Sequence, residues 1–290
     1  MSIRSILAPL DGASDNQAIL DTALNLACAF NAHLEVLHVR PDPRDAMPLF
    51  GEGMSGDLVE DIIATADREA GGRADRLRAM FAERAETRSI PQVAGPGGGE
   101  DAATVAWRED MGREDEMVAW RGRLSDLIVT ARPGEGSSPM RGLTLHAALF
   151  DSGRPVLALP IEPEVHEIGR SIAIAWNGTA QSARAVRGAM PLILRAAEVH
   201  VLTCESERSN PTPADELAAY LGWWGVTPHT HCFPPEEEGA GYALLGESRR
   251  VMADMLVCGA YSHPRLMQTV LGGVTSVLMD EAGIPVLFSH

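Results

Sequence analysis

The chain has 290 residues, of which 45% are hydrophobic and 22% charged, and its formal net charge at pH 7 is −16. This length suits two globular domains that each bury a core of their own. The acidic balance argues against nonspecific binding to nucleic acids or anionic membranes, which needs clustered positive charge, so we expect neither as a partner.

The first half alternates between strand-like and helix-like segments from its beginning. Its first apolar run ends in Asp11-Gly12, and amphipathic stretches then alternate with apolar ones. The predicted strands are residues 3–10, 34–40, 103–109, 126–131 and 155–159, and the predicted helices are 14–31, 57–87, 114–123 and 141–151. The glycine-rich stretch 94–101 follows no apolar strand, so we interpret it as a surface connection.

The second half repeats the first. Residues 5–39 align with 171–204, residues 125–131 with 253–260, and residues 153–160 with 283–290. The predicted strands here are residues 170–176, 198–204, 226–233, 254–259 and 284–289, and the predicted helices are 179–196, 213–223, 237–252 and 273–282. Residues Pro160–Glu164 form the predicted linker.

Strands alternating with helices indicate an α/β fold with a parallel sheet and helices on both faces. We therefore predict two Rossmann-like domains, residues 1–160 and 168–290, each with five strands in the order 3-2-1-4-5. The last strands, in "RPVLALP" and "IPVLFSH", are expected to pair and make the chain an internal pseudo-dimer, while assembly into a homo-oligomer stays open.

Several residue types limit the chemistry and the cellular compartment. All 24 basic residues are arginine, which excludes Schiff bases and phosphate-loop lysines. No CxxC spacing is present, and Cys28, Cys204 and Cys258 lie in apolar stretches, so we expect them to be buried thiols. Since the sequence shows neither a signal-peptide pattern nor a run of about 20 apolar residues, we expect a cytoplasmic protein.

A binding site in such a sheet is expected beyond the strand ends where the strand order reverses, between strands 1 and 4. The loop after strand 1 carries Asp11-Gly12 in the first half and Asn177-Gly178 in the second. The loop after strand 4 carries Ala131–Gly134 in the first half and Gly259–Ser262 in the second.

Over nearly its whole length, the chain resembles a tandem pair of universal stress protein domains, a family related in architecture to the adenine nucleotide alpha hydrolases. Nucleotide-binding members have an Asp after strand 1, which holds the nucleoside, and a Gly-x2-Gly-x9-Gly-Ser/Thr loop after strand 4, which wraps the phosphates. Glycines let the backbone approach the ligand, and N–H groups at a helix N-terminus favour an anion. The resemblance therefore implies binding of ATP or another adenine nucleotide.

The second half keeps the spacing of this loop as Gly259-x2-Ser262-x9-Gly272-Gly273. Ser262 replaces the second glycine and Gly273 replaces the hydroxyl residue, for which Thr275 or Ser276 would compensate. Asn177 stands at the position of the Asp and can still bond a ribose hydroxyl. Positive charge would come from His263 and Arg265. The nucleotide-binding residues predicted here are Asn177, Gly259, Ser262, His263, Gly272, Gly273 and Thr275.

The first half departs further from the family pattern. Asp11 is kept, but Ala131 replaces the first glycine and Leu143 stands at the hydroxyl position. Aligning Gly134 and Gly142 with the family glycines requires a loop two residues shorter. We interpret this half as a scaffold with a degenerate site, whose weaker candidate residues are Asp11, Gly134 and Gly142.

Two other motifs bear on function. In "HTHCF", His229 and His231 point to one face of a predicted strand and Cys232 to the other, which we interpret as a partly exposed third strand rather than a metal site. Trp223 and Trp224 are expected to pack against the core. We expect no metal site and find no catalytic triad or paired carboxylates.

Three functions stay open on the sequence. The first is a stress-response regulatory protein that binds an adenine nucleotide in its second half and is not an enzyme. The second is an interaction or scaffold protein whose sites have decayed. The third is a slow nucleotide hydrolase or nucleotidyl-transfer enzyme, suggested only by analogy of architecture.

Overall fold

The computed structural model describes residues 2–13, 16–42, 56–95, 102–134, 139–160, 168–205, 213–260 and 273–290. The elements of the N-terminal repeat are β1 (Ser5–Pro9), α1 (Asn16–Phe30), β2 (His33–Arg40), α2 (Gly56–Thr87), β3 (Thr104–Met111), α3 (Glu114–Gly122), β4 (Leu127–Ala131), α4 (Pro139–Asp151) and β5 (Val156–Leu159). Those of the C-terminal repeat are β6 (Ser171–Ala175), α5 (Ala180–Ile193), β7 (Glu198–Cys204), α6 (Ala214–Gly222), β8 (His229–Phe233), α7 (Ala240–Arg250), β9 (Met255–Gly259), α8 (Gly273–Glu281) and β10 (Val286–Ser289). The predicted alternation of strands and helices is thereby confirmed.

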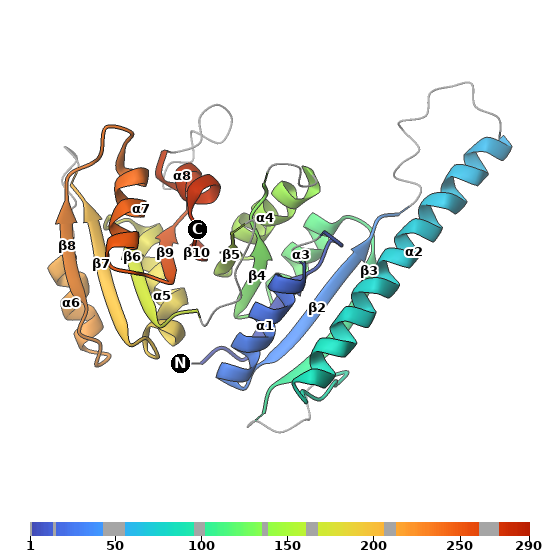
Figure 1. Ribbon diagram of the computed structural model, residues 1–290, viewed down its shortest axis with the longest axis horizontal. Coiled ribbons are helices and arrows are strands. Elements are labelled where there is room, and N and C mark those ends of the chain that lie inside the picture. Colours follow the sequence, from blue (N-terminus) through green and yellow to red (C-terminus); the bar gives the residue numbers. More distant parts are fainter. Residues whose placement is uncertain are drawn as a thin grey trace.

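The strands form one ten-stranded sheet in the order β3-β2-β1-β4-β5-β10-β9-β6-β7-β8 (Figure 1). Each repeat contributes five parallel strands in the predicted order 3-2-1-4-5. The repeats join where β5 and β10 pair antiparallel, with Leu157 opposite Leu287. This pairing confirms the predicted association of the last strands. The boundary between two separately folding domains stays a prediction.

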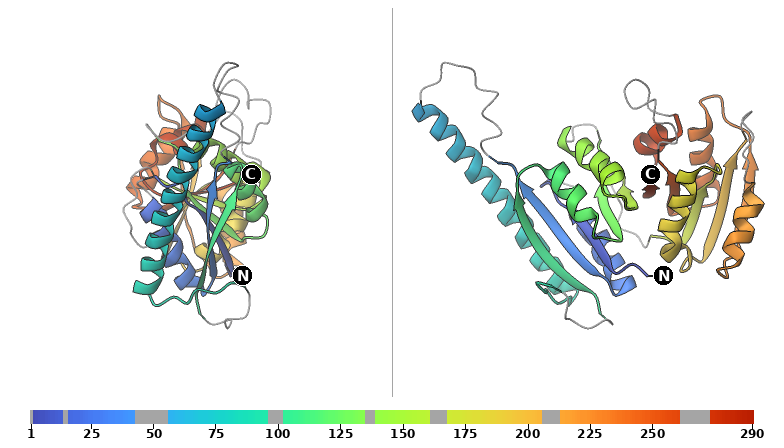
Figure 2. Two further views of the ribbon diagram at one scale, coloured as in Figure 1. Left: turned by 90° about the vertical axis from the view of Figure 1, so that its right-hand side faces the viewer. Right: turned by 180° about the vertical axis from the view of Figure 1, so that it is seen from behind.

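The core has two layers, one on each face of the sheet. Residues of α1, α2, α5 and α6 pack on one face, and residues of α3, α4, α7 and α8 pack on the other. Figure 2 shows α3 and α4 coming to the front when the molecule is seen from behind. The short central strands β5 and β10 are buried throughout, as expected for strands covered on both faces.

The same aspartate contact before the fourth strand occurs in both repeats. The Asp126 carboxylate accepts hydrogen bonds from the backbone N–H groups of Arg4 and Ser5 at 2.8 and 3.1 Å. The Asp254 carboxylate does the same for Arg170 and Ser171 at 2.9 and 3.0 Å. Each carboxylate fixes the start of the first strand relative to the fourth, which places their far ends side by side.

The repeats differ most in the helix after their second strand. The helix α2 has 32 residues, whereas its counterpart α6 has 9. At 1.5 Å per residue, α2 is about 48 Å long. It therefore runs past the ends of β2 and β3, as Figure 1 shows.

Some local predictions are wrong. The Trp223 side chain is 89% exposed rather than packed, because it follows the last turn of α6 and projects beyond the helix end. Trp224 is partly covered, with the Arg187 guanidinium 5.6 Å from its ring centroid. Cys258 is buried as expected, but Cys204 is only half-buried and Cys28 is exposed on the outer side of α1.

Two elements of the C-terminal repeat begin three residues later than predicted. A turn through Gly225, whose φ is +78°, precedes β8, and a turn from Glu236 to Gly239 precedes α7. Glycine adopts positive φ values without strain, so these two turns form easily. They delay the start of β8 and of α7, although the sequence pattern suggests that each element begins earlier. Most of the predicted linker and of the glycine-rich stretch 94–101 lies outside the described residues.

Candidate functional site

The predicted sites lie where the strand order reverses in each repeat. In the N-terminal repeat β1 pairs with β2 on one side and β4 on the other, and in the C-terminal repeat β6 pairs with β7 and β9. Asp11 and Asn177 follow β1 and β6 at these two points. We call the two places site 1 and site 2.

In site 1 the side chain of Asp11 is held by the protein itself. Arg141, in the first turn of α4, donates to both Asp11 carboxylate oxygens, with its Nη2 2.8 Å from Oδ2 and 3.0 Å from Oδ1. Asn16 Nδ2 and the Ala13 N–H also donate to Asp11 Oδ1, at 2.7 and 2.9 Å. Burial by itself would raise the pKa of Asp11, but these bonds and the Arg141 charge hold it below its usual value. The carboxylate is therefore fully engaged without a ligand.

Glu114, at the start of α3, completes this cluster. Burial, together with the nearby Asp11 charge, raises its pKa from 4.5 to about 7, although Thr144 Oγ1 donates to it at 2.9 Å. Against Gly12 lies the Arg73 side chain of α2. Site 1 thus gathers Asp11, Arg141 and Glu114, and the raised pKa of Glu114 favours its neutral form more than in an ordinary glutamate.

The two glycines predicted for site 1 lie on either side of its phosphate-loop position. Gly134 lies half-buried in the loop after β4, and Gly142 lies inside α4 with open space where a Cβ would stand. Sequence reasoning missed Arg141, Asn16 and Glu114. The one available signal was an arginine directly before Gly142, at the position where the resemblance places a phosphate loop.

At site 2, the side chain that follows the first strand has fewer partners than at site 1. The Asn177 side chain is exposed, and its Oδ1 accepts from the Thr179 hydroxyl at 2.7 Å and from the Thr179 N–H at 3.2 Å. Thr179 in turn caps α5 by accepting from the Ser182 N–H. Among the described residues, no group bonds the Asn177 Nδ2. This amide therefore remains available at the strand end.

The glycine after β9 has a structural role of its own. A Cβ on Gly259 would lie 2.5 Å from the backbone N of Ser182 and 2.6 Å from the carbonyl carbon of Gln181. Only glycine lets the first turn of α5 approach β9 so closely. Ala131 occupies this position in the N-terminal repeat and is buried there.

The helix α8 begins at Gly273, which has open space where a side chain would stand, and Thr275 is buried in its first turn. Ser276 donates to Asp280 within the same helix, at 3.2 Å. The predicted residues Ser262, His263 and Gly272, and also Arg265, lie outside the described residues.

The C-terminal end of α8 is held by the other repeat. Arg132, directly after β4, is 2% exposed and donates to the carbonyls of Leu278, Met279 and Ala282. Burial lowers its pKa to about 10, so the guanidinium stays charged at neutral pH. A cation at a helix C-terminus is electrostatically favourable. The helix that begins at site 2 is therefore anchored by a residue next to site 1.

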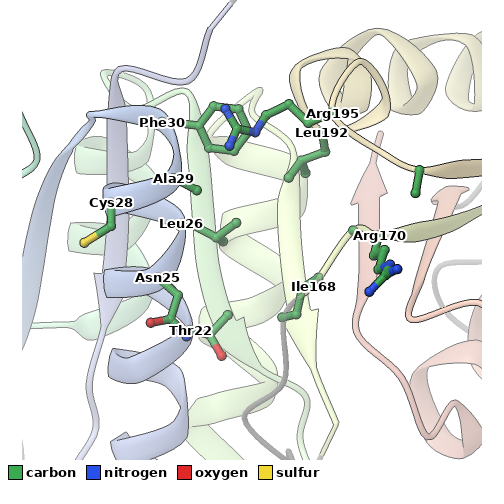
Figure 3. A pocket seen from close by; sticks show the side chains of 12 residues that line it. Thr22, Asn25, Leu26, Cys28, Ala29, Phe30, Ile168, Arg170, Leu192 and Arg195 are labelled. Atoms are coloured by element: carbon green, nitrogen blue, oxygen red, sulfur yellow. The ribbon is translucent and has the colours of Figure 1, made fainter. Parts of the chain in front are cut away.

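A groove of about 540 Å³ lies between α1 and the C-terminal end of α5, away from both sites. Figure 3 shows the Arg195 guanidinium over the Phe30 ring at one end, 5.1 Å from the centroid, with Asn25 and Thr22 along α1. Its walls come from both repeats. Because its residues include none of those predicted for binding, the groove does not belong to either site.

Two absences apply to the described part of the chain. No helix there is long and apolar enough to cross a membrane. No group of three or more His, Cys, Asp or Glu side chains there could hold a metal ion.

The Universal stress protein family matches residues 2–137. The whole chain is similar in structure to a universal stress protein from Archaeoglobus fulgidus DSM 4304, with a TM-score of 0.72, 16% identity and coverage of 98% of this chain and 97% of that one. A functionally unknown protein from Pseudomonas aeruginosa PAO1 is similar with a TM-score of 0.56, 14% identity and coverage of 99% and 92%. At these identities the likeness shows the fold. Among curated proteins, none matches the chain.

Proposed function

Because residues 2–137 belong to the universal stress protein family and the C-terminal repeat has the same strand order, we propose that the chain is a stress-response regulatory protein that binds an adenine nucleotide at site 2. ATP is the first ligand to test. The proposal gives the chain one binding site rather than two, and places it in the half that the family match does not cover.

The contrast between the two strand ends carries this proposal. At site 1 the Asp11 carboxylate is bound by Arg141 and Asn16, so a ribose hydroxyl would have to displace an ion pair whose arginine is buried. At site 2 the Asn177 amide is exposed, and the first turn of α8 offers backbone N–H groups with open space at Gly273. A helix N-terminus with such access favours an anionic group.

We infer that binding is the activity and that hydrolysis is not. General acid–base catalysis requires a titratable group within hydrogen-bond reach of the substrate, and the described candidate residues Asn177, Gly259, Gly273 and Thr275 supply none. The one titratable candidate, His263, lies outside the described residues, and we assign it to the phosphate charge. A regulatory protein requires only that the bound and free forms differ. The anchoring of α8 by Arg132 connects site 2 to the opposite repeat, which offers a route by which binding changes the junction.

The test compares matched glycines. Gly273→Asp places a negative charge at the start of α8, and Gly142→Asp places the same charge in α4, each at a position where a Cβ meets no other atom within 4 Å. We expect millimolar ATP, ADP or AMP to raise the Tm of the wild type and of Gly142→Asp. The Gly273→Asp variant should lose this response, because its carboxylate repels phosphate.

Two results would contradict the proposal. The first is the absence of any Tm shift and of any calorimetric binding in the wild type with all three nucleotides, which would favour an interaction protein with decayed sites. The second is an undiminished response in Gly273→Asp, which would move binding elsewhere. Nucleotide turnover that is lost in Asn177→Ala would instead support the hydrolase alternative.

A further inference from the structure

The groove between α1 and the C-terminal end of α5 differs in charge from the chain as a whole. The formal net charge of the chain is −16, whereas the residues that line the groove include two arginines, Arg170 and Arg195, and no Asp or Glu. Walls of low dielectric that carry one sign of charge concentrate ions of the opposite sign. The groove therefore attracts an anion to a protein that repels anions overall.

Two carboxylates that lie next to lining residues already have partners. Asp21 is paired with Arg84 at 3.2 Å and with Arg88 at 2.8 Å. Asp254 accepts from three backbone N–H groups at and just before the beginning of β6, at 2.8, 2.9 and 3.0 Å. Within the described part of the chain, no carboxylate is paired with either guanidinium of the groove. Both arginines of the groove are thus left for an external acid.

The walls of the groove also contain apolar side chains from both repeats. Figure 3 shows Leu26 on α1, Leu192 on α5 and Ile168, which precedes β6, around the space between the repeats. The groove volume of about 540 Å³ lies within the range of sites that take small organic ligands. Such sites combine apolar walls with a few polar groups that orient the ligand. The groove has both, so it suits a molecule with an apolar body and one charged group.

Arg195 is the better placed of the two arginines. Its guanidinium lies over the Phe30 ring, 5.1 Å from the centroid, and this contact limits the freedom of a long side chain. The contact uses the face of the cation and leaves its N–H groups for hydrogen bonds. Paired N–H groups of arginine match the oxygen atoms of a carboxylate or a phosphate. Arg170, which is exposed directly before β6, adds a second positive charge.

We propose that this groove binds a small organic anion with an apolar body, its acidic head at Arg195 and its body against Leu26 and Leu192. Because α1 belongs to one repeat and α5 to the other, such a ligand connects the two repeats and stabilises their junction. The proposal is independent of nucleotide binding, since the groove lies at the beginning of β6 and site 2 lies at its end.

The experiment titrates the full chain with two fluorescent probes that differ in charge, anilinonaphthalene sulfonate and the neutral N-phenylnaphthylamine. Sodium decanoate, a carboxylate with an aliphatic body, and ATP serve as competitors. The groove variants are Arg195→Gln, which removes the proposed contact, and Ala29→Glu, which adds a negative charge at an exposed lining residue. Arg187→Gln is the matched control for the first, since Arg187 lies over the Trp224 ring outside the groove. Ala64→Glu, at an exposed alanine of α2, is the control for the second.

We expect the sulfonate to bind saturably at one site per chain, to be displaced by decanoate and not by millimolar ATP, and to bind about tenfold more tightly than the neutral probe. Each groove variant should weaken this binding about tenfold, and both controls should leave it unchanged.

Circular dichroism checks that the variants fold, and if Arg195→Gln does not, the exposed Ala29→Glu decides. The absence of saturable binding, equal affinity for the two probes, or binding that survives Ala29→Glu overturns the proposal. Displacement of the sulfonate by ATP also overturns it, because the probe would then occupy the nucleotide site. This last result leaves the proposed function of site 2 intact, so the two proposals fail separately.

Discussion

Site 1 and site 2 occupy the same place in two copies of one fold, but their strand ends differ: within the described residues, the side chain after β1 has all its polar atoms bonded, whereas the amide nitrogen after β6 has no partner. Asp11, the residue that the family pattern assigns to the nucleoside, is bonded by Arg141 and Asn16. Asn177, which departs from that pattern, keeps an exposed amide. A residue that matches a binding pattern can thus already have its hydrogen-bond partners inside the protein.

The two places are also connected through one side chain. Arg132 leaves the strand end next to site 1 and bonds the carbonyl end of α8, whose other end forms part of site 2. Its counterpart in the C-terminal repeat is Ala260, which has no such reach. Within the described residues this arginine contact has no equivalent at Ala260, and the following predictions test this asymmetry.

The largest effect is expected for Arg132→Met, which removes a buried guanidinium from several carbonyl groups. Each buried acceptor left without a partner costs about 1–3 kcal/mol, so we expect a loss of about 3 kcal/mol or more in the free energy of unfolding, measured in urea. The C-terminal repeat should lose protection from hydrogen exchange first. Arg123→Met, which removes an exposed bond to the Asp151 carbonyl, should cost less than about 1 kcal/mol. Equal losses in both variants would argue against a special role for Arg132.

Next in size is Gly259→Ala. The new methyl group would meet backbone atoms of Gln181 and Ser182, which cannot move without shifting α5. Overpacking of this kind costs about 1–3 kcal/mol. Gly142→Ala, in open space within α4, should instead be neutral or slightly stabilising. A neutral Gly259→Ala would mean that its glycine serves a ligand rather than packing.

The sequence predicted the framework well because its signals are local or periodic. Alternating apolar patterns placed the elements to within three residues, and the repeat placed β5 against β10. Arg132 and Arg141 could not be predicted in the same way. Their partners lie about 130 to 150 residues away, and nothing in a local pattern states where a long arginine side chain ends.

The same limit explains the wrong predictions at the surface. Trp223 was expected inside because tryptophan buries a large area, but its exposure depends on where α6 ends. The contact of His200 with His229 and His231 could not be predicted, because His200 lies on β7 and the other two histidines lie on β8. The residue type predicts whether a side chain tends to be buried or exposed, and the tertiary structure determines whether that tendency is followed.

A smaller effect is expected for Glu114→Gln, and it depends on pH. The pKa of Glu114 rises on folding from 4.5 to about 7, so the folded state binds this proton more tightly, and wild-type stability falls as pH rises through that window. The glutamine cannot ionise and still accepts from Thr144. At 1.36 kcal/mol per pKa unit the full effect is roughly 3 kcal/mol, which solvent screening of a half-buried group reduces to about 1–2 kcal/mol.

Unfolding free energies of both proteins at pH 5 and pH 8 measure this effect. The unfolding free energy of Glu114→Gln should rise relative to that of the wild type from pH 5 upward. The difference should stop growing above about pH 7. Asp11 does not interfere, because its pKa lies below 3.8, outside the window. A difference in unfolding free energy between the two proteins that does not change with pH would mean that Glu114 is ionised across the whole range.

The smallest effect is expected for Asn177→Asp, which restores the acidic residue at site 2 without changing the fold. A carboxylate can accept from the Thr179 N–H and hydroxyl as the Asn177 amide does, so stability should change by less than about 0.5 kcal/mol. The aspartate has an oxygen in place of the Nδ2 donor, so a ribose hydroxyl that accepts from the amide would instead donate to the carboxylate. A hydrogen bond to a charged acceptor is stronger than one with a neutral amide by up to about 1 kcal/mol, which is roughly a fivefold gain in affinity for ATP. The exchange Asp11→Asn at site 1 is the control, and should leave ATP affinity unchanged because Arg141 occupies that site. Tighter binding in Asn177→Asp alone would locate the nucleoside at site 2, whereas weaker binding in Asp11→Asn would show that the ion pair at site 1 opens for a ligand.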